Sequence, residues 1–284
     1  MKGWFDGHVH AAPDVIARRY DDTELVRHYA DSGARGFVLK SHHESTVGRA
    51  AAARRLSGVD VLGGVALNHA VGGLSAAVVF AALKAGGRIV WMPTADAAVH
   101  AERGQPRLCD LDSRVTEATL ALPPLDRSAE TEVRRILDLI AEHGAVLATG
   151  HISADEVFWL IDAARAHGVS GILATHPAYI VPGLGIGEIA DLAAAGVHIE
   201  ITAHQFLHQP GCTQELLAQV AHAAGDRLIL TSDVGQTNSP PPVRAVELLT
   251  NALQACGVDR ARLVAAQTSV PVQLFAAPAP RLAT

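Results

Sequence analysis

The chain of 284 residues has the length of one large domain or two small ones. Its composition, 49% hydrophobic and 18% charged, allows a substantial core and excludes a disordered chain. A formal net charge of −6, without long lysine or arginine runs, is unfavourable for nucleic-acid binding. Histidine is the unusual feature, because its 15 copies equal phenylalanine, tryptophan, tyrosine and cysteine combined. Histidine is the commonest metal ligand, so the positions of these residues are the first guide to function.

The cellular environment is indicated by cysteine usage and by the absence of long apolar segments. Three cysteines, Cys109, Cys212 and Cys256, form no disulfide framework and fit a reducing compartment. The first residues lack the apolar core of a signal peptide, and no apolar run approaches the roughly 20 residues that span a bilayer. We expect a cytoplasmic homo-oligomer that binds a small-molecule substrate and neither nucleic acid nor membrane.

Short apolar runs recur along the chain, and several end in histidine or another polar residue. Continuous runs of this length are typical of strands that are buried on both faces, as in a parallel sheet. Strands are predicted at residues 4–10, 36–40, 61–68, 88–92, 145–151, 171–176, 197–201 and 227–233. Helices are predicted between them at residues 22–32, 44–56, 74–85, 130–143, 155–167, 186–195 and 213–224, and several end just before a glycine.

The alternation of strand and helix, with eight strands in fewer than 300 residues, predicts an α/β fold, a (β/α)8 TIM barrel forming a single domain over residues 1–277. A doubly wound sheet would carry a glycine-rich phosphate loop after its first strand, where this sequence has His8 and His10 instead. A polar, proline-containing insertion at residues 95–128 follows the fourth strand, and we expect it to act as a loop or lid. Residues 278–284 are expected to form a frayed tail.

Several histidines lie at the C-terminal ends of the predicted strands, which converge on the catalytic face of a barrel. His8 and His10 are two residues apart on one strand, so their side chains point the same way. Imidazoles combined with a carboxylate suit Zn²⁺, Mn²⁺ or Fe²⁺, and such an ion activates water at neutral pH. The other members of this group are His151, His176 and Asp233. By contrast, His28, His100, His143, His167, His198 and His222 are expected at helix ends, at a strand start or in solvated loops.

This pattern resembles the metal-ligand pattern of the amidohydrolase superfamily. The resemblance rests on His8 and His10 after the first strand, His151 after the fifth, His176 after the sixth and Asp233 after the eighth. It implies one or two divalent ions, with zinc expected and manganese or iron as alternatives. One ion would be held by His8, His10 and Asp233. A second would be held by His151 and His176, or else His176 would orient the substrate; Asp233 would be the catalytic general acid and base.

The sequence departs from this family at the fourth strand. Many two-metal members carry a carboxylated lysine or a glutamate there, whereas residues 90–94 offer neither. The nearest substitute is Lys40, at the end of the second strand, where an unpaired ammonium is costly. Carboxylation would convert Lys40 into an anionic metal bridge, and an ion pair with an aspartate or glutamate is the alternative.

Candidates for substrate binding follow the same strand ends. One of His42 and His43 is expected to contact metal or substrate, and both stay candidates. The full set is His42, His43, His69, Trp91, Tyr179, His204 and Gln236. Arg103 and Arg107, in the insertion, could clamp a substrate carboxylate or phosphate, although a solvated loop arginine is commoner.

The expected function is that of a metal-dependent hydrolase acting on a small molecule. Activated water would cleave an amide, lactam, imide or ester bond, a C–N bond being the first choice, and Asp233 would transfer the proton. A metal-dependent decarboxylase or other lyase of the same superfamily is the enzymatic alternative, in which an arginine near the pocket would matter more. A non-catalytic metal- or ligand-binding barrel is the third possibility.

Overall fold

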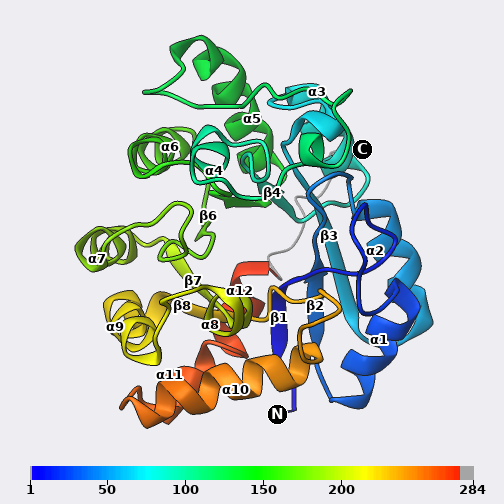
Figure 1. The fold of residues 1–284 in the computed structure, drawn as a ribbon, viewed down its shortest axis with the longest axis vertical. Coiled ribbons are helices and arrows are strands. Elements are labelled where there is room, and N and C mark those ends of the chain that lie inside the picture. The colour runs from blue at the N-terminus through cyan, green and yellow to red at the C-terminus, as the bar shows by residue number, and fades with distance from the viewer. Residues whose placement is uncertain (1, 276–284) are drawn as a thin grey trace.

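A computed structural model describes residues 2–275, and the tail expected at 278–284 lies outside these residues. Eight parallel strands pair in chain order in one sheet (Figure 1). The predicted barrel is confirmed. The strands are β1 (Phe5–Val9), β2 (Gly36–Leu39), β3 (Asp60–Ala66), β4 (Ile89–Trp91), β5 (Val146–Ala148), β6 (Gly171–Ala174), β7 (His198–Thr202) and β8 (Leu228–Thr231).

Hydrogen bonds just beyond β8 join the last strand to the first and nearly close the barrel. The Asp233 N–H donates to the His8 carbonyl at 2.7 Å, and the His10 N–H donates to the Val234 carbonyl at 2.9 Å. The two ends of the strand series therefore meet at the C-terminal ends of the strands, with His8, His10 and Asp233 at the junction.

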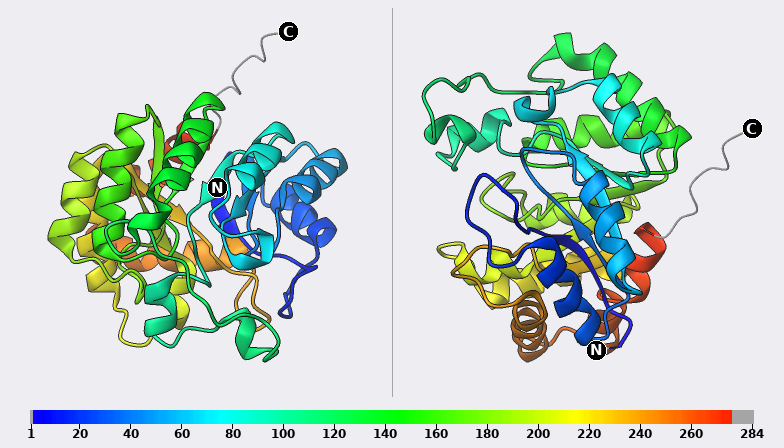
Figure 2. Two further views of the ribbon diagram at one scale, coloured as in Figure 1. Left: turned by 90° about the horizontal axis from the view of Figure 1, so that it is seen from above. Right: turned by 90° about the vertical axis from the view of Figure 1, so that its right-hand side faces the viewer.

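Helices surround the strands in Figures 1 and 2, and the predicted ones are present with their ends shifted by a few residues. They are α1 (Asp22–Asp31), α2 (Val47–Ala53), α3 (Ala76–Lys84), α5 (Glu130–Glu142), α6 (Ala154–Ala166), α7 (Ile186–Ala194) and α9 (Gln214–Ala224). Helices α10 (Pro242–Ala255), α11 (Arg260–Ala265) and α12 (Ser269–Phe275) follow β8. No helix in the described part of the chain is long and apolar enough to span a bilayer.

The barrel interior is apolar at the end opposite the C-terminal ends of the strands. Phe5 of β1 stacks on Phe275 of α12, with ring centroids 5.5 Å apart. A Cβ on Gly7 would lie 3.0 Å from the Phe275 ring, so the glycine makes room for this aromatic plug. The plug excludes water from one end of the barrel, and polar side chains gather at the other end.

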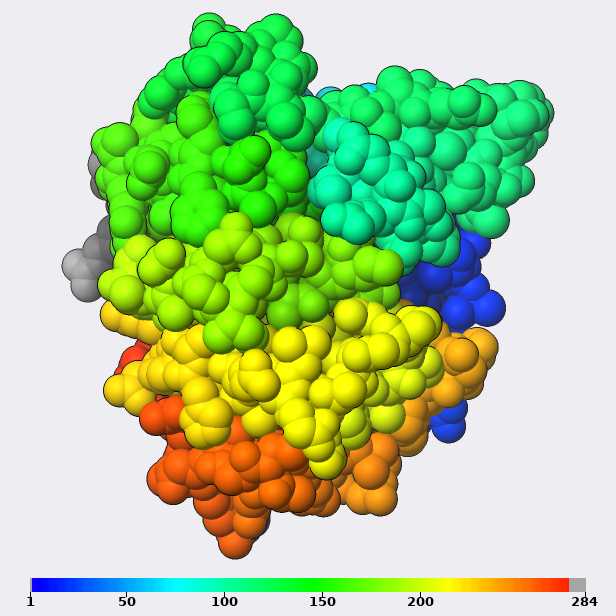
Figure 3. Space-filling view, turned by 60° about the vertical axis from the view of Figure 1, so that its left-hand side comes forward, coloured from blue at the N-terminus to red at the C-terminus, as the bar shows by residue number. Residues whose placement is uncertain are grey.

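Residues 95–128 connect β4 to the helical turn before α5. They contain α4 (Ala98–Glu102) and the short 3-10 helix η3 (Leu108–Asp110). Figure 3 shows this segment, in teal, projecting from the surface beside the blue N-terminal residues. The segment therefore lies where it can border the mouth of the barrel.

Replacing Gly150 by alanine should destabilise the protein strongly. Gly150 has a φ of +67°, and an added Cβ would collide with the backbone carbonyl of Met92 and lie 2.6 Å from that of Pro93. We expect a loss of at least ~3 kcal/mol in the free energy of unfolding, measured by denaturant titration. Gly168→Ala is the matched control, because Gly168 has a φ of +77° with nothing near its Cβ; it should lose only about 1–2 kcal/mol. Equal losses would show that the backbone around Gly150 relaxes.

Candidate active site

A pocket of about 260 Å³ opens at the C-terminal ends of the strands. Most of the predicted site residues line it, namely His10, Lys40, His42, His43, His151, His176, Tyr179, His204, Asp233 and Gln236, and Arg107 lines it as well. His8 is buried in contact with Lys40 and Asp233. The barrel therefore brings residues from strand ends that are distant in sequence together in one pocket.

Besides the buried His8, three predicted residues are not among those that line this pocket. His69 begins the 3-10 helix η2 (His69–Val71), and its N–H donates to Asp96 at 2.9 Å. Trp91 is fully buried, and its ring centroid lies 5.6 Å from the Lys40 Nζ. Arg103 is exposed at the end of α4. Trp91 therefore packs against the buried lysine, whereas His69 and Arg103 lie outside the lining of the pocket.

His8, His10 and Asp233 form a compact group of potential ligands. The Asp233 Oδ1 lies 2.9 Å from the His8 Nε2 and 3.3 Å from the His10 Nε2. One ligand atom from each of the three residues lies within 4.8 Å of the others. Two imidazoles and one carboxylate at this spacing provide ligands that suit a divalent cation.

Glu200, in the middle of β7, orients the ring of His8 through a contact with its Nδ1. The Glu200 Oε1 lies 3.2 Å from the His8 Nδ1 and also accepts the Thr231 hydroxyl at 2.9 Å. Because the carboxylate accepts the Nδ1 hydrogen, a neutral His8 keeps the lone pair of its Nε2 available for a cation. The Glu200 Oε2 accepts the backbone N–H of His176 at 3.1 Å, so one buried carboxylate positions two site histidines.

The electrostatics of this group favour a positive charge. Burial lowers the pKa of His8, but the carboxylates of Asp233 and Glu200 outweigh burial, and the pKa is raised. Burial alone would raise the pKa of Asp233, yet the charge of His8 and hydrogen bonds from His10 and His8 place it well below its ordinary value. Asp233 is therefore ionised, and a cation is favoured beside it.

Lys40 lacks the ion pair that was one of its two predicted arrangements. No carboxylate oxygen of residues 2–275 lies within 4.0 Å of its Nζ, which instead lies 3.0 Å from the His8 Nε2. Burial lowers the pKa of Lys40, although Asp233 and Glu200 oppose this effect. The lysine is thus a buried amine at the centre of the site.

His100 belongs to the site, and the prediction that it is a solvated loop residue is wrong. The insertion folds back over the barrel, so His100 of α4 is buried and its Nδ1 lies 2.9 Å from the His151 Nδ1. Its Nε2 lies 3.1 Å from the Pro106 carbonyl, which can only accept. Burial lowers the pKa of both histidines, so both are neutral.

These contacts assign the hydrogens of the His151 ring. Because the His100 Nε2 donates to Pro106, the His100 Nδ1 must accept, and the His151 Nδ1 donates to it. The His151 Nε2 then carries a lone pair, and in the described part of the chain it has no hydrogen-bond partner although it is buried. A buried, unpartnered lone pair on a pocket histidine is suited to a metal ligand.

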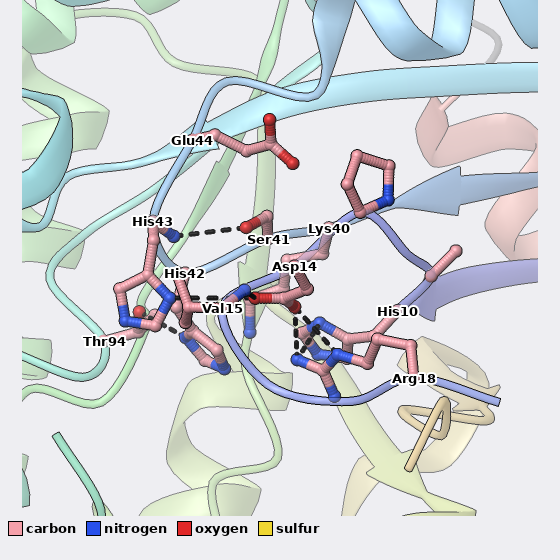
Figure 4. A network of polar contacts seen from close by, with 12 residues as sticks. His10, Asp14, Val15, Arg18, Lys40, Ser41, His42, His43, Glu44 and Thr94 are labelled. Carbon is pink, nitrogen blue, oxygen red and sulfur yellow. Dashed lines mark hydrogen bonds and ion pairs between the residues drawn. The ribbon is translucent and has the colours of Figure 1, made fainter. Parts of the chain in front are cut away.

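His42 differs from His151 in the tautomer of its ring, because its Nε2 carries a hydrogen and not a lone pair. The Asn68 Oδ1 accepts the backbone N–H groups of Thr94 and Asp96, so the Asn68 amide donates to the Thr94 hydroxyl at 2.7 Å. The Thr94 hydroxyl is then left to donate to the His42 Nδ1 at 2.8 Å (Figure 4). Burial keeps the pKa of His42 well below its ordinary value, so the neutral ring carries its hydrogen on Nε2. His42 is therefore an N–H donor.

The loop between β1 and α1 places a buried ion pair beside His10. Arg18 contacts Asp14 at 2.7 Å, and the same guanidinium lies 3.4 Å from the His10 Nδ1 (Figure 4). Burial and the charge of Arg18 lower the pKa of His10 to about 3, so His10 is neutral. Arg107 also has a carboxylate neighbour, Asp96, at 3.4 Å. Both arginines of the pocket are thus neutralised by the protein.

The backbone is strained at two of these positions. His176 and Asp233, with φ values of +26° and +48°, are the only non-glycine residues in the described part of the chain that have positive φ. Such conformations cost free energy and concentrate at functional sites. The strain therefore supports the choice of these two residues independently of their chemistry.

Comparison with known proteins agrees with the fold. The profile of a family described as a family of unknown function, DUF6282, matches residues 3–200. The chain belongs to this family. No curated protein matches the sequence.

Solved structures resemble this DUF6282 protein over almost its whole length. An amidohydrolase from Pseudomonas aeruginosa has a TM-score of 0.65 at 13% identity, covering 96% of this chain and 95% of the other. A lactonase from Listeria monocytogenes has a TM-score of 0.63 at 12% identity, covering 96% and 94%. The phosphotriesterase homology protein from Escherichia coli, solved with phosphate in its active site, has a TM-score of 0.64 at 13% identity, covering 96% and 99%. The DUF6282 chain therefore has the fold that the resemblance to amidohydrolases implied.

Glu200→Gln should weaken the binding of a divalent ion by about 10- to 100-fold while the protein stays folded. Glutamine has only one acceptor oxygen, so it cannot accept from His8, Thr231 and the His176 backbone at once. Titration calorimetry with Zn²⁺ measures the affinity, and Glu215→Gln, at an exposed position, is the control. Unchanged affinity in Glu200→Gln would show that Glu200 does not orient His8 for a metal.

Proposed function

We propose that the protein is a metal-dependent hydrolase that cleaves an amide, lactam, imide or ester bond of a small molecule. The observation that carries the proposal is the convergence of His8, His10 and Asp233 beside the unpartnered His151 Nε2 in a pocket at the barrel mouth. The similar structures include an amidohydrolase and a lactonase, which supports hydrolysis without selecting the bond.

The donor set fits one or two divalent ions, and we take zinc as the first candidate. His8, His10 and Asp233 would hold one ion. His151 Nε2 and His176 Nδ1, both buried without a hydrogen-bond partner in the described residues, would hold the second. Lys40, which has no carboxylate partner there, would bridge the two as a carboxylated side chain.

When bound, such an ion would activate water and polarise the scissile bond. Asp233 would accept the proton of the attacking water and deliver it to the leaving group. The His42 N–H would donate to the substrate oxygen as negative charge develops on it, and the contacts of Thr94 and Asn68 keep this hydrogen on Nε2. Tyr179, His204 and Gln236 would shape the pocket around the substrate.

The pocket arginines favour hydrolysis over the lyase alternative. A lyase that grips a substrate carboxylate needs a guanidinium that is free to bind it. Arg18 is paired with Asp14 and Arg107 with Asp96, so each already has a carboxylate neighbour. The same pocket contains an ionised Asp233, which would give a hydrolase its acid and base.

Asp233→Asn should abolish turnover while leaving most of the metal bound. The amide keeps an oxygen ligand but cannot accept the proton of the attacking water. The assay is hydrolysis of a panel of lactones, esters and amides by the zinc-loaded protein, with metal content measured by elemental analysis. Unchanged turnover in the variant would refute the role of Asp233. Two metal ions per wild-type chain are expected; one would remove the bridging role of Lys40, and none would overturn the proposed function.

His42→Leu should lower kcat by about 100-fold with little change in metal content, as expected for the loss of one donor to a developing negative charge. His42→Gln, which restores an N–H donor, should recover part of the loss. Long-range ¹H–¹⁵N correlation spectra of the metal-free protein report the tautomer directly. They should show the Nε2–H form in the wild type and in Thr94→Ser, and a mixture in Thr94→Val. A wild-type Nδ1–H form would contradict the assignment.

A further inference from the structure

The mouth of the pocket is bordered by apolar side chains that are exposed to water. Val15 and Ile16, in the loop between β1 and α1, are 50% and 43% exposed. Leu111, in the insertion, is 61% exposed, and the neighbouring Leu108 lines the same pocket. These four residues are here called the apolar rim. Exposed apolar groups that gather around one cavity mark a binding surface, whereas scattered ones do not.

The apolar rim and the polar floor belong to a single cavity. The floor contains imidazoles, Lys40 and Asp233, whereas the rim comes from two loops that are far apart in the sequence, one of which also contributes Gln105 and Asp110 to the lining. Arg18 and Arg107 line the same cavity, and each is already paired with a carboxylate. A ligand that fills the cavity therefore meets both the polar groups of the floor and the apolar side chains of the rim, and it meets no unpaired arginine.

We propose that the apolar rim is a subsite for an uncharged alkyl or aryl substituent of the substrate, next to the bond that is cleaved. The proposal rests on the proposed function and narrows its substrate to an amphiphilic small molecule. The volume of about 260 Å³ supports this occupant, because it lies below the ~300–1,000 Å³ of drug-sized ligand pockets. A protein partner would need a much larger surface, roughly 800 Å² on each side.

The test uses the full-length, zinc-loaded protein and p-nitrophenyl esters from acetate to octanoate. In the wild type, kcat/KM should rise about fourfold for each added methylene until the cavity is filled. In Ile16→Asn and Leu111→Asn the octanoate ester should lose more of its kcat/KM than the acetate ester. Leu125→Asn is the matched control, because Leu125 lies in the same insertion and is 57% exposed but does not line the pocket. It should keep the wild-type dependence on chain length.

A binding experiment separates this proposal from the proposed function. Calorimetry compares acetate with octanoate, which need no turnover to bind. Tighter binding of octanoate that is lost in the rim variants, in a protein that hydrolyses none of the lactones, esters and amides of the panel, would support the subsite and refute the hydrolase. Hydrolysis without dependence on chain length, or with the same dependence in the rim variants, would overturn the subsite. A changed oligomeric state in the rim variants, by size-exclusion chromatography and with chain-length dependence intact, would overturn it too and identify an interface between copies.

Discussion

The site depends on the contact that joins the two ends of the strand series. The Asp233 N–H donates to the His8 carbonyl at 2.7 Å, so the last candidate ligand is fixed to the first by the backbone. The buried carboxylate of Asp6 stabilises this contact. Its Oδ1 accepts the backbone N–H groups of Ser232 and His8, and its Oδ2 accepts the Tyr29 hydroxyl. A barrel that opened here would separate His8 from Asp233, and the three potential metal ligands would no longer lie close together.

The same closure explains how strained residues are tolerated. Asp233 has positive φ, but its N–H is held by His8; His176 has positive φ, but its N–H is held by Glu200. Buried hydrogen bonds to these groups offset the conformational cost, since breaking them would leave unsatisfied polar groups. Both side chains line the pocket, so the strained backbone lies directly at the candidate site.

The fold and the principal site residues were predictable because they depend on local patterns. Apolar runs, helix spacing and glycines at helix ends indicate a barrel, and a barrel brings its strand ends together. Glu200 was missed, although a glutamate inside a buried strand is itself a signal. Its partner His8 is distant in sequence, and only the closed sheet makes them neighbours. His100 was missed because no periodicity predicts that the insertion folds back over the barrel.

The ambiguity between His42 and His43 shows a different limit. Both line the pocket, so their position alone does not separate them. What distinguishes His42 is the direction of its hydrogen, which follows from Asn68 and Thr94 on two other strand ends. Hydrogen placement depends on contacts between segments far apart in the chain, and such contacts leave no spacing pattern in the sequence.

The insertion links the floor of the pocket to its mouth. His100 fixes the tautomer of His151, and the same segment supplies Leu108 and Leu111 to the apolar rim. A change in the insertion that reshapes the rim can therefore also shift His100, and the lone pair of His151 would then no longer be fixed on Nε2. The fit of the substrate and the chemistry of the floor are consequently not independent in this barrel, because residues of the same insertion contribute to both.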